Sequence, residues 1–156
     1  PVRGGGVDVL GGDSTLASAG HDAPLLLHAD GRHEVLPVQP GPPLGFEVRD
    51  DFTVWNGRVP AGATLLAYTD GVTEAFDPAD VAFGLERLRD ALRAGNTARE
   101  ECEQLIAQVH AFTEPAPQSD DITVLAIRRR LDTVTGSPEA TPPQETPHAD
   151  ATVHSP

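Results

Sequence analysis

The sequence contains no lysine, no methionine and a single cysteine. Its 11 basic residues are therefore all arginines, and 24 acidic residues outnumber them to give a formal net charge of −13 at pH 7. Such a chain repels nucleic-acid phosphates and anionic lipids, so we expect neither nucleic acid nor a membrane surface as its partner. The lone Cys102 excludes an internal disulfide and a zinc site built from thiolates. It fits a reducing compartment, and we expect a cytoplasmic protein.

Aromatic residues and long apolar runs are also scarce. Aromatics make up 4% of the chain, so its core must be aliphatic. No segment approaches the ~20 apolar residues of a membrane span, and residues 1–6 lack the apolar centre of a signal peptide. Because the chain starts at Pro1 and has no methionine, we expect it to be part of a longer protein.

Residues 131–156 differ in composition from the rest of the chain. They contain five prolines, four acidic residues and no arginine or aromatic residue. A segment with so little to bury cannot offset the entropy lost on ordering, so we predict a disordered tail there. The folded domain is expected in residues 1–130.

The remaining sequence predicts many strands, then two helices, then one strand. Strands are expected at 7–10, 15–18, 25–29, 34–37, 47–54, 63–68 and 122–127, with turns at 11–14, 30–32 and 55–57 and an irregular proline loop at 41–45. Leucines spaced three and four apart predict a helix at 85–92 that ends at Gly95. Thr97 and Glu100 form a capping-box pair that starts the second helix. This order indicates an α+β fold with a mostly antiparallel sheet.

Two acidic positions lie at the ends of predicted strands. Asp70 follows the strand at 63–68, and Asp120 and Asp121 precede the strand at 122–127. If these strands are antiparallel neighbours, the end of one lies beside the start of the other, and the carboxylates converge at one edge of the sheet. Converging carboxylates need a positive partner, and their oxygens favour Mg²⁺ or Mn²⁺ over zinc. The pattern therefore suggests a metal site at this edge.

The residues alone leave a second interpretation open. An Asp-Gly pair after a strand is commonly a plain turn, and an aspartate before a strand is commonly a loop cap. The chain would then be an acidic α+β domain with solvated carboxylates. Metal titration distinguishes the two interpretations.

Five segments carry a family signature: AGHDAPLLL at 19–27, GPPLG at 41–45, LLAYTDGVTEA at 65–75, FGLERL at 83–88 and DDITVL at 120–125. In this order they resemble the SpoIIE-like bacterial branch of the PPM phosphatases, over residues 7–130. The resemblance implies an α-β-β-α sandwich, two Mn²⁺ or Mg²⁺ ions in the complete domain, and hydrolysis of phosphoserine or phosphothreonine on a regulatory protein. In relatives of this branch the dephosphorylated partner is often an anti-sigma-factor antagonist, and the resemblance implies such a phosphoprotein as the partner of this chain.

The resemblance also assigns roles to individual residues. It implies that Asp70 and Asp120 ligate metal, that Gly71 contributes through its backbone, and that Asp121 holds the second motif position, ranked below Asp120. The family needs no protein nucleophile, which agrees with Cys102 on the apolar face of a helix. We expect His21 to fix the geometry of its loop.

One part of the family pattern is missing. Such phosphatases have an earlier Asp-Gly strand whose aspartate bridges the two metals, and here Gly12-Asp13 is the sole early candidate, placed in a predicted turn. We therefore expect a sandwich that is incomplete at its N-terminal side, through truncation or degeneration, and little activity from this chain alone. The rival interpretation is a pseudophosphatase that binds a phosphoprotein without turnover.

Overall fold

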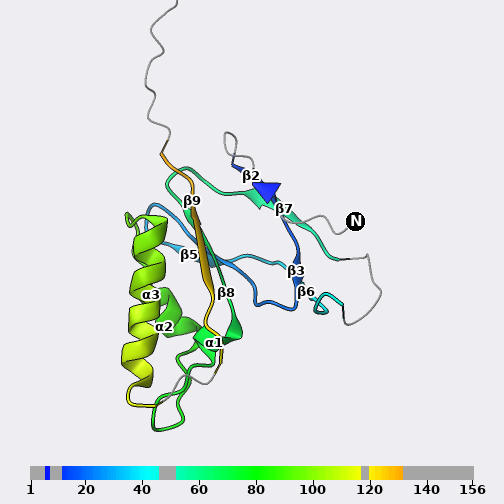
Figure 1. Cartoon of the computed structure of the whole chain (residues 1–156). Coiled ribbons are helices and arrows are strands. Elements are labelled where there is room, and N and C mark those ends of the chain that lie inside the picture. The colour runs from blue at the N-terminus through cyan, green and yellow to red at the C-terminus, as the bar shows by residue number, and fades with distance from the viewer. Residues whose placement is uncertain (1–5, 8–11, 46–51, 117–119, 132–156) are drawn as a thin grey trace, which may run out of the picture.

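The computed structural model describes residues 6–7, 12–45, 52–116 and 120–131, which form an α+β fold. A central sheet lies between a layer of helices and a second group of strands (Figure 1). No helix in the described part of the chain is long and apolar enough to cross a membrane. The predicted disordered tail, apart from Leu131, lies outside the described residues.

The central sheet has four antiparallel strands in the order β5-β4-β8-β9. They are β4 Leu25–Leu27, β5 His33–Val35, β8 Thr64–Tyr68 and β9 Val124–Arg128. The apolar run and the last strand are antiparallel neighbours, which was the condition for the carboxylates to converge, since Tyr68 pairs with Val124 and Thr64 with Arg128. This pairing places the end of β8 beside the start of β9.

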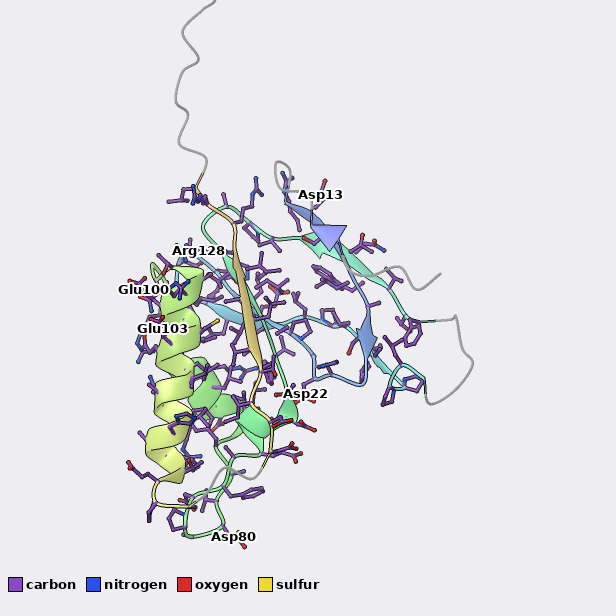
Figure 2. The ribbon with its side chains drawn as sticks, in the orientation of Figure 1. Asp13, Asp22, Asp80, Glu100, Glu103 and Arg128 are labelled. Atoms are coloured by element: carbon purple, nitrogen blue, oxygen red, sulfur yellow. The ribbon has the colours of Figure 1, made fainter. Side chains whose placement is uncertain are left out.

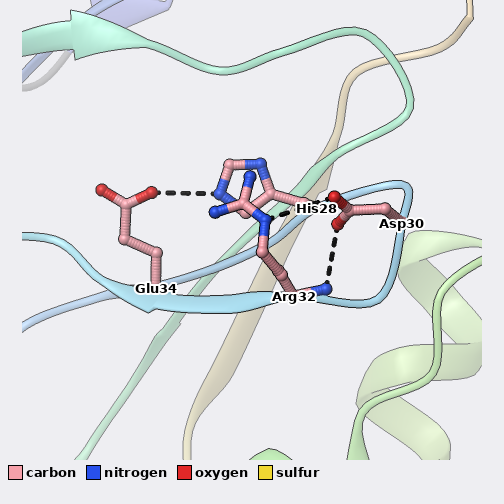
Figure 3. A network of polar contacts seen from close by, with 4 residues as sticks. All are labelled: His28, Asp30, Arg32 and Glu34. Carbon is pink, nitrogen blue, oxygen red and sulfur yellow. Dashed lines mark hydrogen bonds and ion pairs between the residues drawn. The ribbon is translucent and has the colours of Figure 1, made fainter.

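The turn between β4 and β5 is the predicted hairpin turn at 30–32 (Figure 3). The Asp30 carboxylate accepts hydrogen bonds from the Arg32 backbone N–H at 3.0 Å and from Arg32 Nε at 3.2 Å. These bonds lower the pKa of Asp30 from its ordinary 3.8. His28 Nε2 and a Glu34 carboxylate oxygen lie 3.0 Å apart across the hairpin. Together these local contacts fix the turn that sets the β4–β5 register.

Three helices cover one face of the central sheet (Figure 1). They are α1 Asp70–Thr73, α2 Gly84–Ala91 and α3 Ala98–Thr113. The capping box that the sequence predicts is present, because the Thr97 hydroxyl accepts from Glu100 N–H and the Glu100 carboxylate accepts from Thr97 N–H. Between helices and sheet lies one aliphatic core: Leu25, Leu27, Leu66, Tyr68, Val72, Ala75, Phe83, Leu88, Ala91, Leu92, Leu105 and Val109.

Shorter strands pack toward the opposite face of the sheet. They are β1 Gly6–Val7, β2 Asp13–Leu16, β3 Ser18–Ala19, β6 Pro40–Gly41 and β7 Trp55–Arg58. The order β1-β2-β7 is antiparallel, and β3 pairs with β6 in parallel. A second core of Leu26, Leu36, Val38, Val59, Ala63 and Leu65 lies here, packed by Leu16 and Trp55. The described residues thus form three of the four layers of the expected sandwich.

Several elements predicted from local sequence patterns differ from those in the structure. The predicted turn at 55–57 is strand β7, because Asn56 and Gly57 pair with β2 and the Trp55 ring occupies the space that a side chain at Gly57 would need. Asp13 begins β2 instead of lying in a turn, and Gly41 belongs to β6 within the expected irregular loop. The predicted strand at 47–54 lies partly outside the described residues, and its described end, 52–54, is not a strand.

Glu101, on α3, explains why α2 ends before Gly95. The Glu101 side chain is fully buried, with 0% of its surface exposed, and its two carboxylate oxygens accept from Arg93 N–H at 3.2 and 3.3 Å. Leu92, the residue before Arg93, has an extended backbone, and its side chain is buried in the core. The chain therefore leaves the helix at Ala91, and the predicted end at Gly95 is wrong.

Burial makes Glu101 a pH-dependent contributor to stability. Burial raises the pKa of Glu101 from its ordinary 4.5, against the opposing effects of the Arg93 N–H and of the charges on Arg128 and Arg93. The folded chain thus holds this proton more tightly than the unfolded chain. The free energy of unfolding should gain a contribution as pH falls through the raised pKa toward 4.5.

Urea denaturation across this pH range tests the effect. Glu101→Gln keeps the size and an acceptor oxygen, and it should remove the contribution. Glu103→Gln is the matched control, because Glu103 lies on the outer side of the same helix (Figure 2). Its Oε1 lies 3.6 Å from Arg99 Nη1. Equal pH profiles for wild type and Glu101→Gln would contradict the assignment.

Candidate metal centre at the α1–β9 edge

Asp70 lies at the junction of β8 and α1. Thr69 is the residue before α1, and Glu74 N–H closes the short helix by donating to Asp70 O at 2.7 Å. The Asp70 side chain is exposed, and its Oδ1 accepts from Gly71 N–H at 3.0 Å. A buried strand followed at once by a helical turn therefore presents this carboxylate at the sheet edge.

The segment 120–121 is held against the same junction by Thr69. The Thr69 hydroxyl donates to Asp121 O at 2.9 Å and accepts from Thr123 N–H at 3.0 Å, while Thr69 N–H donates to Thr123 O at 3.1 Å. Asp120 Oδ1 accepts from Asp121 N–H at 2.7 Å. The structure thus brings together the two acidic segments that the sequence separates by fifty positions.

Gly71 permits this approach. A Cβ atom on Gly71 would lie 2.5 Å from Asp121 O and 3.5 Å from the carbonyl carbon of Asp120. Real side chains do not come so close to a carbonyl oxygen, so only glycine fits here. The glycine of the Asp-Gly pair is therefore needed for contact between α1 and the start of β9, beyond any turn that it forms.

Asp22 is a further acidic residue near this edge, and the sequence reasoning did not single it out. Leu25 pairs with Leu66, so the chain just before β4 lies beside the end of β8. Asp22 lines a cavity of about 310 Å³ with Ala23, Val35, Tyr68, Thr73 and Leu85. Burial raises the pKa of Tyr68, and the negative charge of Asp22 adds to this. Figure 2 shows Asp22 close to α1. Only the strand register could have revealed it.

The neighbouring His21 is placed through its backbone. The Ser18 hydroxyl donates to His21 O at 2.7 Å and accepts from His21 N–H at 3.2 Å, and the His21 side chain is exposed. These bonds agree with the expectation that this motif position sets the geometry of its loop.

Asp13 lies at the far end of the molecule from α1 (Figure 2). It pairs with Arg58, and its neighbour Gly12 lies beside Arg129, just after β9 ends. The Asp120 segment lies before the opposite end of that strand. Asp13 is therefore not positioned to complete the edge at α1.

The donors at the edge suit a hard divalent cation. They are carboxylates and backbone carbonyls, and Mg²⁺ in proteins is commonly held by one or two carboxylates while it keeps several waters. Among the described residues, no three His, Cys, Asp or Glu side chains gather into a metal-binding group. The donor groups at this edge therefore fit a cation that is held by few protein ligands.

Comparison with known proteins identifies relatives of this arrangement. The family model described as Stage II sporulation protein E (SpoIIE) matches residues 5–130. Protein IcfG from Synechocystis sp. is 32% identical over 127 residues, which are 80% of this chain and 20% of that protein. The chain therefore spans about a fifth of the length of this curated relative.

Solved structures share the fold. The RsbU and RsbW domains of Rv1364c from Mycobacterium tuberculosis match with a TM-score of 0.61 at 27% identity, over 81% of this chain and 35% of that one. The phosphatase domain of SpoIIE from Bacillus subtilis matches with a TM-score of 0.62 at 19% identity, over 83% and 58%. With the family match over most of its length and this architecture, the chain belongs to the SpoIIE family and has the fold of PP2C-type phosphatase domains.

Proposed function

We propose that this chain forms part of a divalent-metal-dependent phosphatase domain that hydrolyses phosphoserine or phosphothreonine on a regulatory protein. The observation that carries the proposal is the edge where Thr69 and Gly71 hold Asp70 beside Asp120 and Asp121. A plain solvated turn does not require a glycine packed against a second acidic segment. The family membership supports the reaction class.

In this proposal the protein groups are positioned before any ligand arrives. Asp70 and Asp120 would hold Mn²⁺ or Mg²⁺, with Gly71 contributing through its backbone and Asp121 in the second motif position. Bound there, such an ion would supply the positive charge that activates water and neutralises phosphoryl oxygens. Thr69 fixes the spacing of the two segments with three hydrogen bonds, so little ordering entropy remains to be lost on binding.

The proposed substrate is a phosphorylated regulatory protein, such as an anti-sigma-factor antagonist. The solved structures with this fold include PppA of Pseudomonas aeruginosa, which is described as a key regulatory component of T6SS and agrees with a regulatory setting. A cytoplasmic location is part of the same proposal.

Mn²⁺ titration by calorimetry tests the proposed ligands. Asp70→Asn and Asp120→Asn should each weaken Mn²⁺ binding by about tenfold or more, because each removes a charged ligand oxygen. Asp13→Asn is the matched control, because Asp13 lies at the far end of the molecule from α1. This variant should bind Mn²⁺ as tightly as wild type does. An equal loss of Mn²⁺ affinity in all three variants would indicate diffuse attraction to an acidic surface and would contradict the proposed metal site.

A further inference from the structure

The cavity at Asp22 lies on the helical side of the central sheet, beside the acidic edge. Its volume is about 310 Å³, and its lining residues come from β5, β8, α1, α2 and the segment just before β4: Asp22, Ala23, Val35, Tyr68, Thr73 and Leu85. All of these residues belong to the described part of the chain. Ligand pockets commonly measure about 300–1,000 Å³, so this cavity suits one side chain and not a larger molecule.

Helix α1 joins the cavity to the proposed metal site. Thr73 and Asp70 lie at the two ends of α1, and the Thr73 hydroxyl donates to Asp70 O at 3.3 Å. One helical turn advances about 5 Å, and one residue of an extended peptide spans about 3.5 Å. A peptide held at Asp70 therefore reaches the cavity with a residue one or two positions away.

The lining combines apolar walls with one free carboxylate. Ala23, Val35 and Leu85 provide apolar surface, and Tyr68 adds an aromatic side chain. Asp22 is exposed and makes none of the ion pairs found within the described ranges. An arginine side chain has the matching parts, because its stem is apolar and its planar guanidinium pairs with carboxylates.

The charge around the cavity also favours a cation. Burial raises the pKa of Tyr68, the negative charge of Asp22 raises it further, and the opposing effect of Arg89 is smaller. Negative charge therefore prevails at the Tyr68 hydroxyl although an arginine lies nearby. Asp70 and the acidic segment 120–121 continue the same sign of charge along the edge, which attracts a basic segment.

We propose that this cavity binds an arginine side chain of the phosphoprotein substrate, one or two positions from the phosphorylated residue. The guanidinium lies at Asp22, and the stem lies against Val35 and Leu85. The proposal rests on the proposed phosphatase function for the phosphorylated residue itself. Asp22 takes no part in hydrolysis and acts as a specificity residue that favours basic phosphorylated segments.

Fluorescence anisotropy with two labelled peptides tests the assignment. In one peptide phosphoserine has two arginines on each side, and in the other the four arginines are citrullines, which have a similar length and no charge. Wild type should prefer the arginine peptide, and Asp22→Asn should reduce this preference by about fivefold, as expected for one partly exposed ion pair.

Asp80→Asn is the matched control, because it removes one negative charge from a loop away from Asp22 (Figure 2). Asp80 has a φ of 66°, which asparagine also adopts readily. This variant should keep the arginine preference of wild type. An equal reduction in both variants would indicate diffuse attraction to an acidic chain and would overturn the proposal. So would equal affinity of wild type for the two peptides, or no binding of the arginine peptide.

Repeating the titrations in EDTA, and with serine in place of phosphoserine, separates this cavity from the metal site. The arginine preference and its dependence on Asp22 should persist in EDTA. If Mn²⁺ and the phosphate group leave the affinity unchanged while Asp22→Asn still removes the preference, the proposed metal site is contradicted and the arginine cavity is supported. A preference that disappears in EDTA would assign the arginine contact to the metal-bound edge and overturn the cavity.

Discussion

Gly71→Ala is expected to lower the free energy of unfolding by about 2 kcal/mol, as overpacking commonly does. Helix propensity alone predicts the opposite sign, because alanine is favoured over glycine inside a helix by about 1 kcal/mol. The contact with Asp121 decides the outcome, since the new methyl carbon would lie 2.5 Å from a carbonyl oxygen. Either α1 or the 120–121 segment must move. Urea denaturation measures the change.

The same substitution should also separate the two acidic segments, so Mn²⁺ binding should weaken together with stability. Gly31→Ala serves as the control, because a Cβ there meets nothing within 4 Å and the cost is limited to its φ of +87°. A Gly71→Ala chain as stable as wild type, with unchanged Mn²⁺ affinity, would show that the approach of α1 to Asp121 is not required.

Hydrolysis of a phosphoserine peptide by the 156-residue chain alone is expected to be slow or undetectable, even at millimolar Mn²⁺. The described residues bring two acidic segments together, at Asp70 and Asp120, and Asp13 lies at the other end of the molecule. Two metal ions that share a water need more carboxylates than these segments provide. The rate should stay near that of the peptide in buffer with Mn²⁺.

A phosphate-release assay measures this, with the SpoIIE phosphatase domain of Bacillus subtilis as positive control. Rapid Mn²⁺-dependent release by the 156-residue chain would show that a ligand has been overlooked. Tight peptide binding without release would instead favour the pseudophosphatase interpretation. The metal titration of Asp70→Asn remains informative under either outcome.

The predictions that were right concern elements determined by residues close together in the sequence. The apolar run at 63–68, the turn at 30–32 and the capping box at Thr97 each depend on residues a few positions apart, and each is present. The meeting of Asp70 with Asp120 followed from one further assumption, that the flanking strands are antiparallel neighbours. That assumption is confirmed by the β8–β9 register.

The elements that were missed depend on partners distant in sequence. Asn56-Gly57 carries a turn signal, and β2 turns it into a strand because Ser14 and Thr15 pair with it. The end of α2 depends on Glu101 of the next helix, which takes the Arg93 N–H. Asp22 lies near α1 through the register of β4 on β8. No local pattern encodes these tertiary contacts.

The hydroxyl of Thr69 joins α1 to the start of β9 by two hydrogen bonds at once. Whatever binds across Asp70 and Asp120 therefore contacts two elements that one side chain already joins, and the energetics are reciprocal. A ligand that favours the joined arrangement stiffens the last strand, and a partner that orders β9 raises the affinity of the acidic edge by the same factor. Through the Thr69 side chain, the order of β9 and ligand binding at the acidic edge would be linked.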